Sequence, residues 1–377
     1  MIDSIVDKLI QKQTDNNINI VICSEKHFKE IYITIHPDTD DKISSDINRL
    51  MFLLKKLNAE IVKFDIFGSS SGFNLCMKSL NDVYDNISSP ITFVEGGYCS
   101  QNSSVEIQIY AVSGIPVKTI FAQENPIARV FEDDYAKYCI IGNASGIPSN
   151  LQEKETLETF VNIEKILNLA GMDISNIIRT WFYNNNITLW YDKFNTVRND
   201  FFKQKNIYDK MFPVSTGVGG KNIAHSAIIA GVVAIKVKRN DRIKIQELIS
   251  PLQNPPSLYG SSFSRALEII TPVNRKVLIS GTASIDTKGK TVHAGNIDMQ
   301  IAFTMEVIEA ILKQRDMNFS NVIRSITYFK DIKYSAVFDK YCKKTGKPSF
   351  PMITIQNDIC RDDLLFEIEL DAISTIR

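Results

Sequence analysis

Two glutamates near the carboxyl end of the chain have the type and spacing that suit acid catalysis. Glu367 and Glu369 occur in the alternating segment FEIELDAI, which is typical of a β-strand. Successive side chains of a strand point to opposite faces, so both carboxyls share one face and Phe366, Ile368 and Leu370 share the other. Partial burial would raise the pKa of such a carboxyl and suit it to general-acid chemistry. Two solvated glutamates on an exposed sheet face would explain the same pattern.

The residues before these glutamates predict an antiparallel hairpin. Residues 352–359 form an apolar, β-branched run, residues 361–363 form a polar turn, and residues 364–373 alternate. Cys360 would lie at the mouth of this hairpin. No histidine lies near Cys360 in the sequence, so packing or a substrate contact is a better interpretation than a covalent nucleophile.

Composition limits the class of protein. The 377 residues include 43 Lys+Arg and 43 Asp+Glu, and this balance, without a basic cluster, does not favour nucleic acid as a partner. The six cysteines lack CxxC spacing and the four histidines do not cluster, so no metal site is expected. The N-terminal segment lacks a signal-peptide pattern, and no apolar run reaches membrane-spanning length. We therefore expect a cytoplasmic protein without a membrane partner.

An internal repeat organises the chain. An amphipathic helix, a short break and a strand recur three times, at residues 48–67, 162–183 and 304–329. Each copy is followed by a second helical stretch and a pair of strands, and the last strands align Glu106, Ile229 and Glu367. The length suits several modules, each with its own core.

The repeat divides the chain into three modules. Their boundaries are predicted at residues 1–115, 116–240 and 241–377. The first module is the most degenerate, so we expect it to brace the others, although Glu106 repeats the glutamate of the third module. Residues 238–260 contain three prolines and predict an extended linker into the third module.

The order of these elements resembles the Rid/YjgF superfamily. The resemblance rests on the strands RTWFY and RSITYF, on the segments that begin FP, and on the EIE strand. It implies an α+β fold and, for single-module members, a trimer with ligand clefts between subunits. Three fused modules would form a pseudo-trimer within one chain, with its clefts between modules, and would allow the protein to be monomeric.

Modules two and three are similar to the chorismatase-like (FkbO-type) branch of this superfamily. The similarity lies in FPVSTGVGG, SFSRALEI, ISGTASI and DICRDDLLFEIE. It implies cleavage of pyruvate from chorismate or a similar carboxylated enol ether, by chemistry that needs no cofactor. It also implies that Glu367 protonates the enolpyruvyl methylene, and that Ala283 and Cys360 lie where the branch varies with product type.

Further residues are predicted to bind the substrate. Arg265 and Tyr259 suit a planar carboxylate, although a surface ion pair would explain Arg265 as well. Arg361 would face the cleft or pair with a neighbouring aspartate. Ser284 ends a run in which Ser280 and Thr282 also present hydroxyl groups, which a solvated strand would explain equally well.

A glycine-rich segment, residues 215–220, offers a second means of holding the substrate. Its predicted contacts are Thr216, Gly217 and Gly219, whose backbone N–H groups could form an anion-binding nest. A tight hairpin turn without a binding role is the alternative. Elsewhere in module two, Arg179 and Arg198 are expected to be exposed, although they could line the interface with the adjacent module instead. The aromatic residues of RTWFYNNNITLWY are expected to be core.

Two departures from the family patterns bear on function. Rid deaminases carry an arginine just after the proline of the FP segment, and here the corresponding residues are Ile91, Val214 and Met352. Imine hydrolysis is therefore not expected. Lys330 stands where chorismatases are expected to carry arginine, and a lysine does not reproduce the bidentate fork that binds a carboxylate.

Two alternatives remain open at this point. The chain could be an orphan Rid-type hydrolase of another small acid, or a non-catalytic scaffold that binds a metabolite. A hollow cleft around Glu367 and Arg265 would favour an enzyme, whereas a cleft filled by side chains would favour a scaffold.

Overall fold

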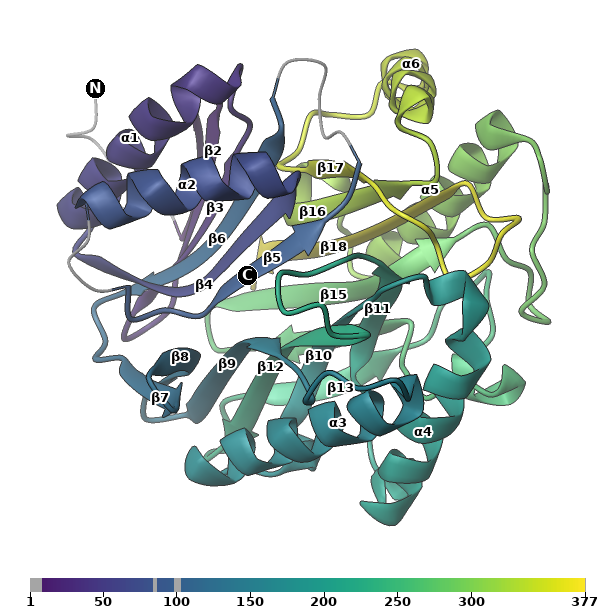
Figure 1. Cartoon of the computed structure of the whole chain (residues 1–377), viewed down its shortest axis with the longest axis horizontal. Helices are drawn as coiled ribbons and strands as arrows, with labels where there is room; N and C mark the ends of the chain where they lie inside the picture. Colours follow the sequence, from purple (N-terminus) through teal and green to yellow (C-terminus); the bar gives the residue numbers. More distant parts are fainter. Residues whose placement is uncertain (1–8, 84–86, 98–102, 377) are drawn as a thin grey trace.

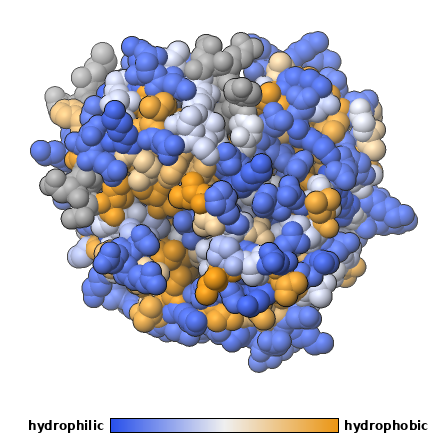
Figure 2. All heavy atoms as spheres, in the orientation of Figure 1, coloured by the Kyte–Doolittle hydropathy of each residue, from blue (hydrophilic) through white to orange (hydrophobic). Residues whose placement is uncertain are grey.

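A computed structural model of the chain describes residues 9–83, 87–97 and 103–376. Residues 1–8, which begin the segment without a signal-peptide pattern, and Cys99 lie outside the described residues. The described chain forms three six-stranded mixed sheets with α-helices on their outer faces (Figure 1). Polar residues cover most of the face in Figure 2, with apolar residues in small groups between them.

The three modules contain the same elements in the same order. The first has β1 (Ile10–Asp15), β2 (Ile18–Ser24), β3 (Lys29–Ile35), α1 (Ile43–Lys56), β4 (Ala59–Gly68), α2 (Ser70–Val83), β5 (Ile91–Glu95) and β6 (Val105–Ser113). The second has β7 (Lys118–Ala122), β8 (Asn125–Glu132), β9 (Ala136–Ala144), α3 (Gln152–Leu169), β10 (Ile177–Asn184), α4 (Tyr191–Gln204), β11 (Val214–Gly219) and β12 (Ile228–Val237). The third has β13 (Lys244–Leu248), β14 (Ala266–Ile270), β15 (Asn274–Ala283), α5 (Ile297–Lys313), β16 (Val322–Phe329), α6 (Ser335–Thr345), β17 (Ile353–Gln356) and β18 (Phe366–Thr375).

Local sequence explains the helices that back the third sheet. Asn296 caps α5, because its side chain accepts a hydrogen bond from the backbone N–H of Met299. The buried residues Ile301, Met305 and Ile308 recur at helical spacing and form one apolar face. This face packs on β15 and β18, which holds the glutamate-bearing strand against a rigid support.

The predicted hairpin of residues 352–373 is wrong. The strand order of the third sheet is β13-β14-β15-β18-β16-β17, so β16 lies between β17 and β18. β17 pairs in parallel with β16, whereas β18 pairs antiparallel with both β15 and β16. A parallel pair needs a crossover connection, and α6 provides it between β16 and β17.

Two segments predicted as irregular each contain a strand. Residues 238–260, predicted as an extended linker, contribute β13 at the edge of the third sheet. Residues 215–220 lie mostly in β11, which pairs in parallel with β10. Because β11 is extended, the glycine-rich segment forms neither the predicted anion nest nor a hairpin turn.

A register shift recurs between the central strands of each module, in the pairs β4–β6, β10–β12 and β16–β18. The residue that follows the shift is basic in all three sheets: Lys63, Arg179 and Arg324. Glu106, Ile229 and Glu367 each lie opposite an aromatic residue of the neighbouring central strand, as the repeat alignment predicted. The repeat seen in the amino-acid sequence is therefore also a repeat of the structure.

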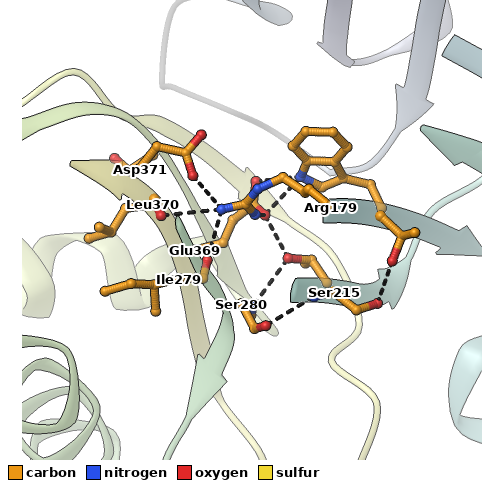
Figure 3. A network of polar contacts seen from close by, with 12 residues as sticks. Arg179, Ser215, Ile279, Ser280, Glu369, Leu370 and Asp371 are labelled. Atoms are coloured by element: carbon orange, nitrogen blue, oxygen red, sulfur yellow. Dashed lines mark hydrogen bonds and ion pairs between the residues drawn. The ribbon is translucent and has the colours of Figure 1, made fainter. Parts of the chain in front are cut away.

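Modules two and three meet at a buried network of charges (Figure 3). Arg179 donates to Glu369 at 2.9 Å and also to Asp371. Arg324 approaches the same two carboxylates, donating to Asp371 at 3.0 Å and also to Glu369. The indole N–H of Trp181 donates to Glu369 at 2.8 Å. Glu369 is fully buried, and burial alone would raise its pKa, but Arg324 and Arg179 hold that pKa below its ordinary value.

This network corrects two expectations from the sequence. Arg179 is 1% exposed rather than solvated, because its guanidinium crosses from module two to the carboxylates of module three. Glu369 does not lie on an exposed sheet face, since the inner faces of the three sheets cover one another. Trp181 belongs to this buried centre, as expected of a core residue.

Arg179→Met should destabilise the protein by about 3–5 kcal/mol, because Glu369 and Asp371 would be left buried with Arg324 as their remaining guanidinium partner. The free energy of unfolding from urea denaturation measures this. The control is Arg239→Met, which breaks an exposed ion pair with Asp241 and should cost less than about 1 kcal/mol. Similar losses in the two variants would show that the buried network does not hold the modules together.

Candidate active site

A cleft of about 550 Å³ opens where module two meets module three. β18 supplies Glu367, β11 supplies Ser215 and Gly217, and α4 supplies Tyr191 and Arg198. The full set of lining residues is Tyr191, Arg198, Ser215, Gly217, Tyr259, Ser261, Phe263, Arg265, Gly281, Ala283, Ile285, Cys360, Arg361, Leu364 and Glu367. The cleft is hollow and combines charged, hydroxyl and aromatic groups.

Glu367 is the carboxylate of this cleft. It is 5% exposed, and burial raises its pKa to about 8, with the charge of Glu369 adding to the shift and Arg265 opposing it. No described residue donates a hydrogen bond to its carboxyl group, which leaves the group available to a ligand. A carboxyl with this pKa is largely protonated at neutral pH and can donate a proton.

Gly281 on β15 makes room for this carboxyl group. A Cβ atom at Gly281 would lie 2.1 Å from Oε1 of Glu367, far inside van der Waals contact. Any larger residue would displace the glutamate. The glycine is therefore required by the close approach of β15 to the Glu367 side chain.

Two buried arginines face the same cleft. Arg265 and Arg198 are 3% and 2% exposed, and burial lowers the pKa of both. Their guanidinium carbons lie 5.4 and 5.7 Å from the ring centroid of Phe263, so the ring stabilises both cations. Arg265 donates to the hydroxyl of Tyr259, and Arg198 donates to Asn195 at 2.6 Å. With Glu367 protonated, Arg198, Arg265 and Arg361 give the lining of the cleft three positive charges, which suit a small anionic ligand.

The expectation that Arg198 is exposed is wrong. Arg198 and Tyr191 lie seven residues apart on one face of α4, and that face packs toward module three. This helical spacing was the available signal, but it does not say which module the face contacts. Tyr191 likewise lines the cleft instead of belonging wholly to the core of module two.

The structure places the predicted site residues in two groups. Seven line the cleft: Glu367, Arg265, Tyr259, Gly217, Ala283, Cys360 and Arg361. Three do not line it: Thr216, Gly219 and Ser284.

The three remaining residues have structural contacts instead. Thr216 donates to Glu369 at 2.6 Å, because alternation along β11 turns Ser215 and Gly217 to the cleft and Thr216 away from it. Gly219 ends β11 and donates to the carbonyl of Asp358 at 2.6 Å. Ser284 donates to the carbonyl of Val292 at 3.0 Å.

Hydroxyl groups join the two walls of the cleft. Ser280, predicted to lie on a solvated or hydroxyl-bearing face, is buried and accepts a hydrogen bond from the backbone N–H of Ser215 at 3.0 Å. It donates to the carbonyl of Ser264. These contacts, which Figure 3 shows in part, tie β15 of module three to β11 of module two, so the solvated-strand interpretation is wrong.

Cys360 and Lys330 have different environments. Burial raises the pKa of the Cys360 thiol to about 12, so the thiol stays protonated and is a poor nucleophile. Lys330 does not line the cleft, because it donates to the carbonyl of Asp362 at 2.7 Å and to its carboxylate at 3.0 Å. Arg361 lines the cleft and donates to the carbonyl of Gly289 at 2.6 Å.

The matching positions of modules one and two lack this environment. Glu106 accepts a hydrogen bond from the backbone N–H of Thr354 at 2.7 Å and lies 3.4 Å from Nδ1 of His36. Module two carries Ile229 at the same place and has no carboxyl group there. The carboxyl of Glu106 is thus already engaged within the chain, in contrast to that of Glu367.

The described residues contain neither a cluster of metal ligands nor a membrane-spanning helix. In that part of the chain, no three His, Cys, Asp or Glu side chains are grouped so that they could hold a metal ion. Among the helices of the same residues, none is both long and apolar enough to cross a membrane.

The raised pKa of Glu367 predicts a pH-dependent stability. Glu367 holds its proton more tightly in the folded chain than its ordinary value of 4.5 allows, so it contributes stability below about pH 4.5 that is lost as the pH rises through about 8. Glu367→Gln removes this loss. From pH 5 to pH 9 the free energy of unfolding of the variant should rise relative to wild type by on the order of 4 kcal/mol.

Urea denaturation at several pH values measures this difference. Glu124 is exposed, so Glu124→Gln is the control: it shows how the same substitution changes the free energy of unfolding at the surface. A difference between Glu367→Gln and wild type that stays constant from pH 5 to pH 9 would contradict the raised pKa.

Comparison with known proteins gives three likenesses. Residues 260–374 match the family model described as Endoribonuclease L-PSP. A 3-hydroxybenzoate synthase of Streptomyces hygroscopicus is 23% identical over 245 residues, which are 59% of this chain and 70% of the relative. A solved chorismatase is 16% identical with a TM-score of 0.63, and the match covers 83% of this chain and 92% of that one.

A shorter solved protein matches one part of the chain. A putative endoribonuclease L-PSP of Entamoeba histolytica is 22% identical, with a TM-score of 0.30, over 35% of this chain and 100% of its own. The match to the chorismatase, by contrast, extends over most of both chains. The three repeated sheets and the likeness to the solved chorismatase confirm the α+β fold of three tandem Rid-like modules. The family model and the synthase confirm that the chain resembles the chorismatase-like branch of the Rid/YjgF superfamily.

Proposed function

We propose that the chain is an enzyme that cleaves pyruvate from chorismate, or from a similar carboxylated enol ether, by general-acid protonation. The observation that carries this proposal is Glu367, a buried carboxyl group with a pKa raised to about 8 that faces a hollow cleft. The names of two similar proteins, a 3-hydroxybenzoate synthase and a chorismatase, support chorismate as the substrate class.

The proposed reaction has two stages. Protonated Glu367 transfers its proton to the methylene carbon of the enolpyruvyl group, which leaves an oxocarbenium ion at the ether carbon. Water adds to that carbon, and the resulting hemiketal breaks into pyruvate and the ring alcohol. Glu367 regains a proton from the added water, so the overall change is the addition of one water molecule.

The arginines would bind the substrate. Chorismate carries two carboxylates, and Arg198 and Arg265 supply two buried guanidinium groups, one from each module. The unpartnered Nε of Arg198, buried among the described residues, supports such a role, because a bound carboxylate would supply the missing acceptor. Ala283, Cys360, Tyr259 and Gly217 would shape the pocket around the ring.

The domain organisation supports this assignment. We propose module boundaries at residues 1–115, 116–240 and 241–377, because the three sheets span residues 10–113, 118–237 and 244–375. The proposed partner is a small carboxylated metabolite, and the fused modules would let a monomer form the complete cleft. A scaffold protein would be expected to fill this cleft with side chains, and the carboxyl group of Glu367, which faces the cleft without a hydrogen-bond donor among the described residues, argues against that alternative.

Purified protein should release pyruvate from chorismate, and Glu367→Gln should lower kcat by roughly 100-fold or more, since the general acid is lost. Coupling to lactate dehydrogenase measures pyruvate. Glu106→Gln is a matched control, because it makes the same change at the equivalent position of module one and should keep activity close to wild type. Equal pyruvate release by wild type and Glu367→Gln would sink the proposal.

The pH profile of kcat/KM tests the acid more directly. Activity should fall as the pH rises through about 8, because Glu367 then loses the proton that it must donate. The same assay between pH 6 and pH 9.5 measures this limb. A rate that rises through pH 8 would indicate that the carboxylate acts as a base instead.

A further inference from the structure

A second, separate cavity lies on the axis where the three modules meet. All three sheets contribute to its walls. It shares no lining residue with the cleft around Glu367.

The walls of this axial cavity are largely apolar and aromatic. Ile140 and Ile235 of module two and Leu278 of module three line it and belong to one apolar cluster. The rings of Tyr32 and Tyr110 from module one are stacked, with centroids 5.0 Å apart. Such walls suit an apolar or aromatic molecular body.

The charged groups of the cavity do not balance. Lys63 pairs with Asp65, and Arg179 and Arg324 pair with Glu369 and Asp371, so these groups are neutral together. The remaining lining charges are Glu25, Glu30 and Lys276. Two carboxylates thus share one ammonium group.

This surplus carboxylate is buried. Lys276 donates to Glu30 and lies 3.5 Å from Glu25. Tyr110 donates to Glu30 at 2.6 Å and Asn274 donates to Glu25 at 2.7 Å, but these groups supply no charge. Burial raises the pKa of Glu25, which is the expected response of a carboxylate that lacks a full counter-charge.

An unpartnered acceptor in the same cavity gives an independent indication. Asp65 is 4% exposed, and its Oδ2 accepts from Lys63. Its Oδ1 is buried and has no hydrogen-bond partner among the described residues. A buried carboxylate oxygen without a donor is costly, so a donor from a bound molecule would stabilise it.

We propose that the axial cavity is a second ligand site, which binds a small amphipathic primary amine. The ammonium group would lie at Glu25 and Glu30 and supply the missing positive charge. The apolar or aromatic body would pack between the isoleucines and the tyrosine pair, and a hydroxyl at its far end would donate to Asp65.

Tyramine is a suitable probe, because it combines a primary amine, an aromatic ring and a hydroxyl group. Isothermal titration calorimetry should show binding to wild type, and Glu25→Gln should weaken it by about tenfold or more through loss of a charged hydrogen bond. Glu25→Gln should fold, because it leaves one carboxylate and one ammonium in balance; far-UV circular dichroism checks this. Glu367→Gln, in the other cleft, should bind tyramine as wild type does.

Fluorescence reports where the probe binds. Trp181 lines the axial cavity and the other tryptophan, Trp190, lies in the core of module two, so Trp190→Phe leaves Trp181 as the reporter. Tyramine should change the emission of this variant. Phenethylamine should bind more weakly because it lacks the hydroxyl, and 3-(4-hydroxyphenyl)propionate should not bind because its charge is reversed.

Three outcomes would overturn the proposal. The first is that tyramine produces neither heat with the wild type nor a fluorescence change with Trp190→Phe. The second is that folded Glu25→Gln binds tyramine with the affinity of the wild type. The third is that 3-(4-hydroxyphenyl)propionate binds as tightly as tyramine.

Discussion

The buried contact of Glu369 and Asp371 with Arg179 and Arg324 is the constraint on which the geometry of the cleft around Glu367 depends. Taking these charges out of water costs several kcal/mol per ion, and their mutual attraction offsets that cost only if the geometry is maintained. The contact crosses from module two to module three, 190 residues apart between Arg179 and Glu369. It therefore determines how β11 and α4 face β18, and so where the wall of the cleft lies relative to Glu367.

The two glutamates of β18 show how environment assigns chemical roles. Glu367 and Glu369 share one face of one strand, yet burial raises the pKa of the first while two guanidinium groups hold the pKa of the second below its ordinary value. The ionised Glu369 also repels a second negative charge nearby and adds to the shift of Glu367. The network that joins the modules thus contributes to keeping the proposed acid protonated.

Fusion of three modules into one chain allows their equivalent positions to differ. Gly217 lines the open cleft beside Glu367. The corresponding residue beside Glu106 is Thr354, and its backbone N–H donates a hydrogen bond to the carboxylate of Glu106. Module two has Ile229 in place of the glutamate. In a homotrimer a substitution is repeated in every cleft, but here one cleft can stay open while the other positions serve packing.

The sequence by itself determined the repeat, the α+β module and the candidate acid, because these depend on local periodicity. Alternation placed Glu367 and Glu369 on one face, and the repeat aligned Glu367 with Glu106 and Ile229. Residue chemistry also pointed to Arg265 and Tyr259, which do meet in the cleft.

Only the tertiary structure decided which glutamate is surrounded by arginines and which faces open space. It also inserted β16 between β17 and β18, turned Thr216 away from the cleft and brought Arg198 into it. Strand order and the packing of modules depend on contacts between residues far apart in the chain, and local patterns carry no information about which distant partner a face will meet.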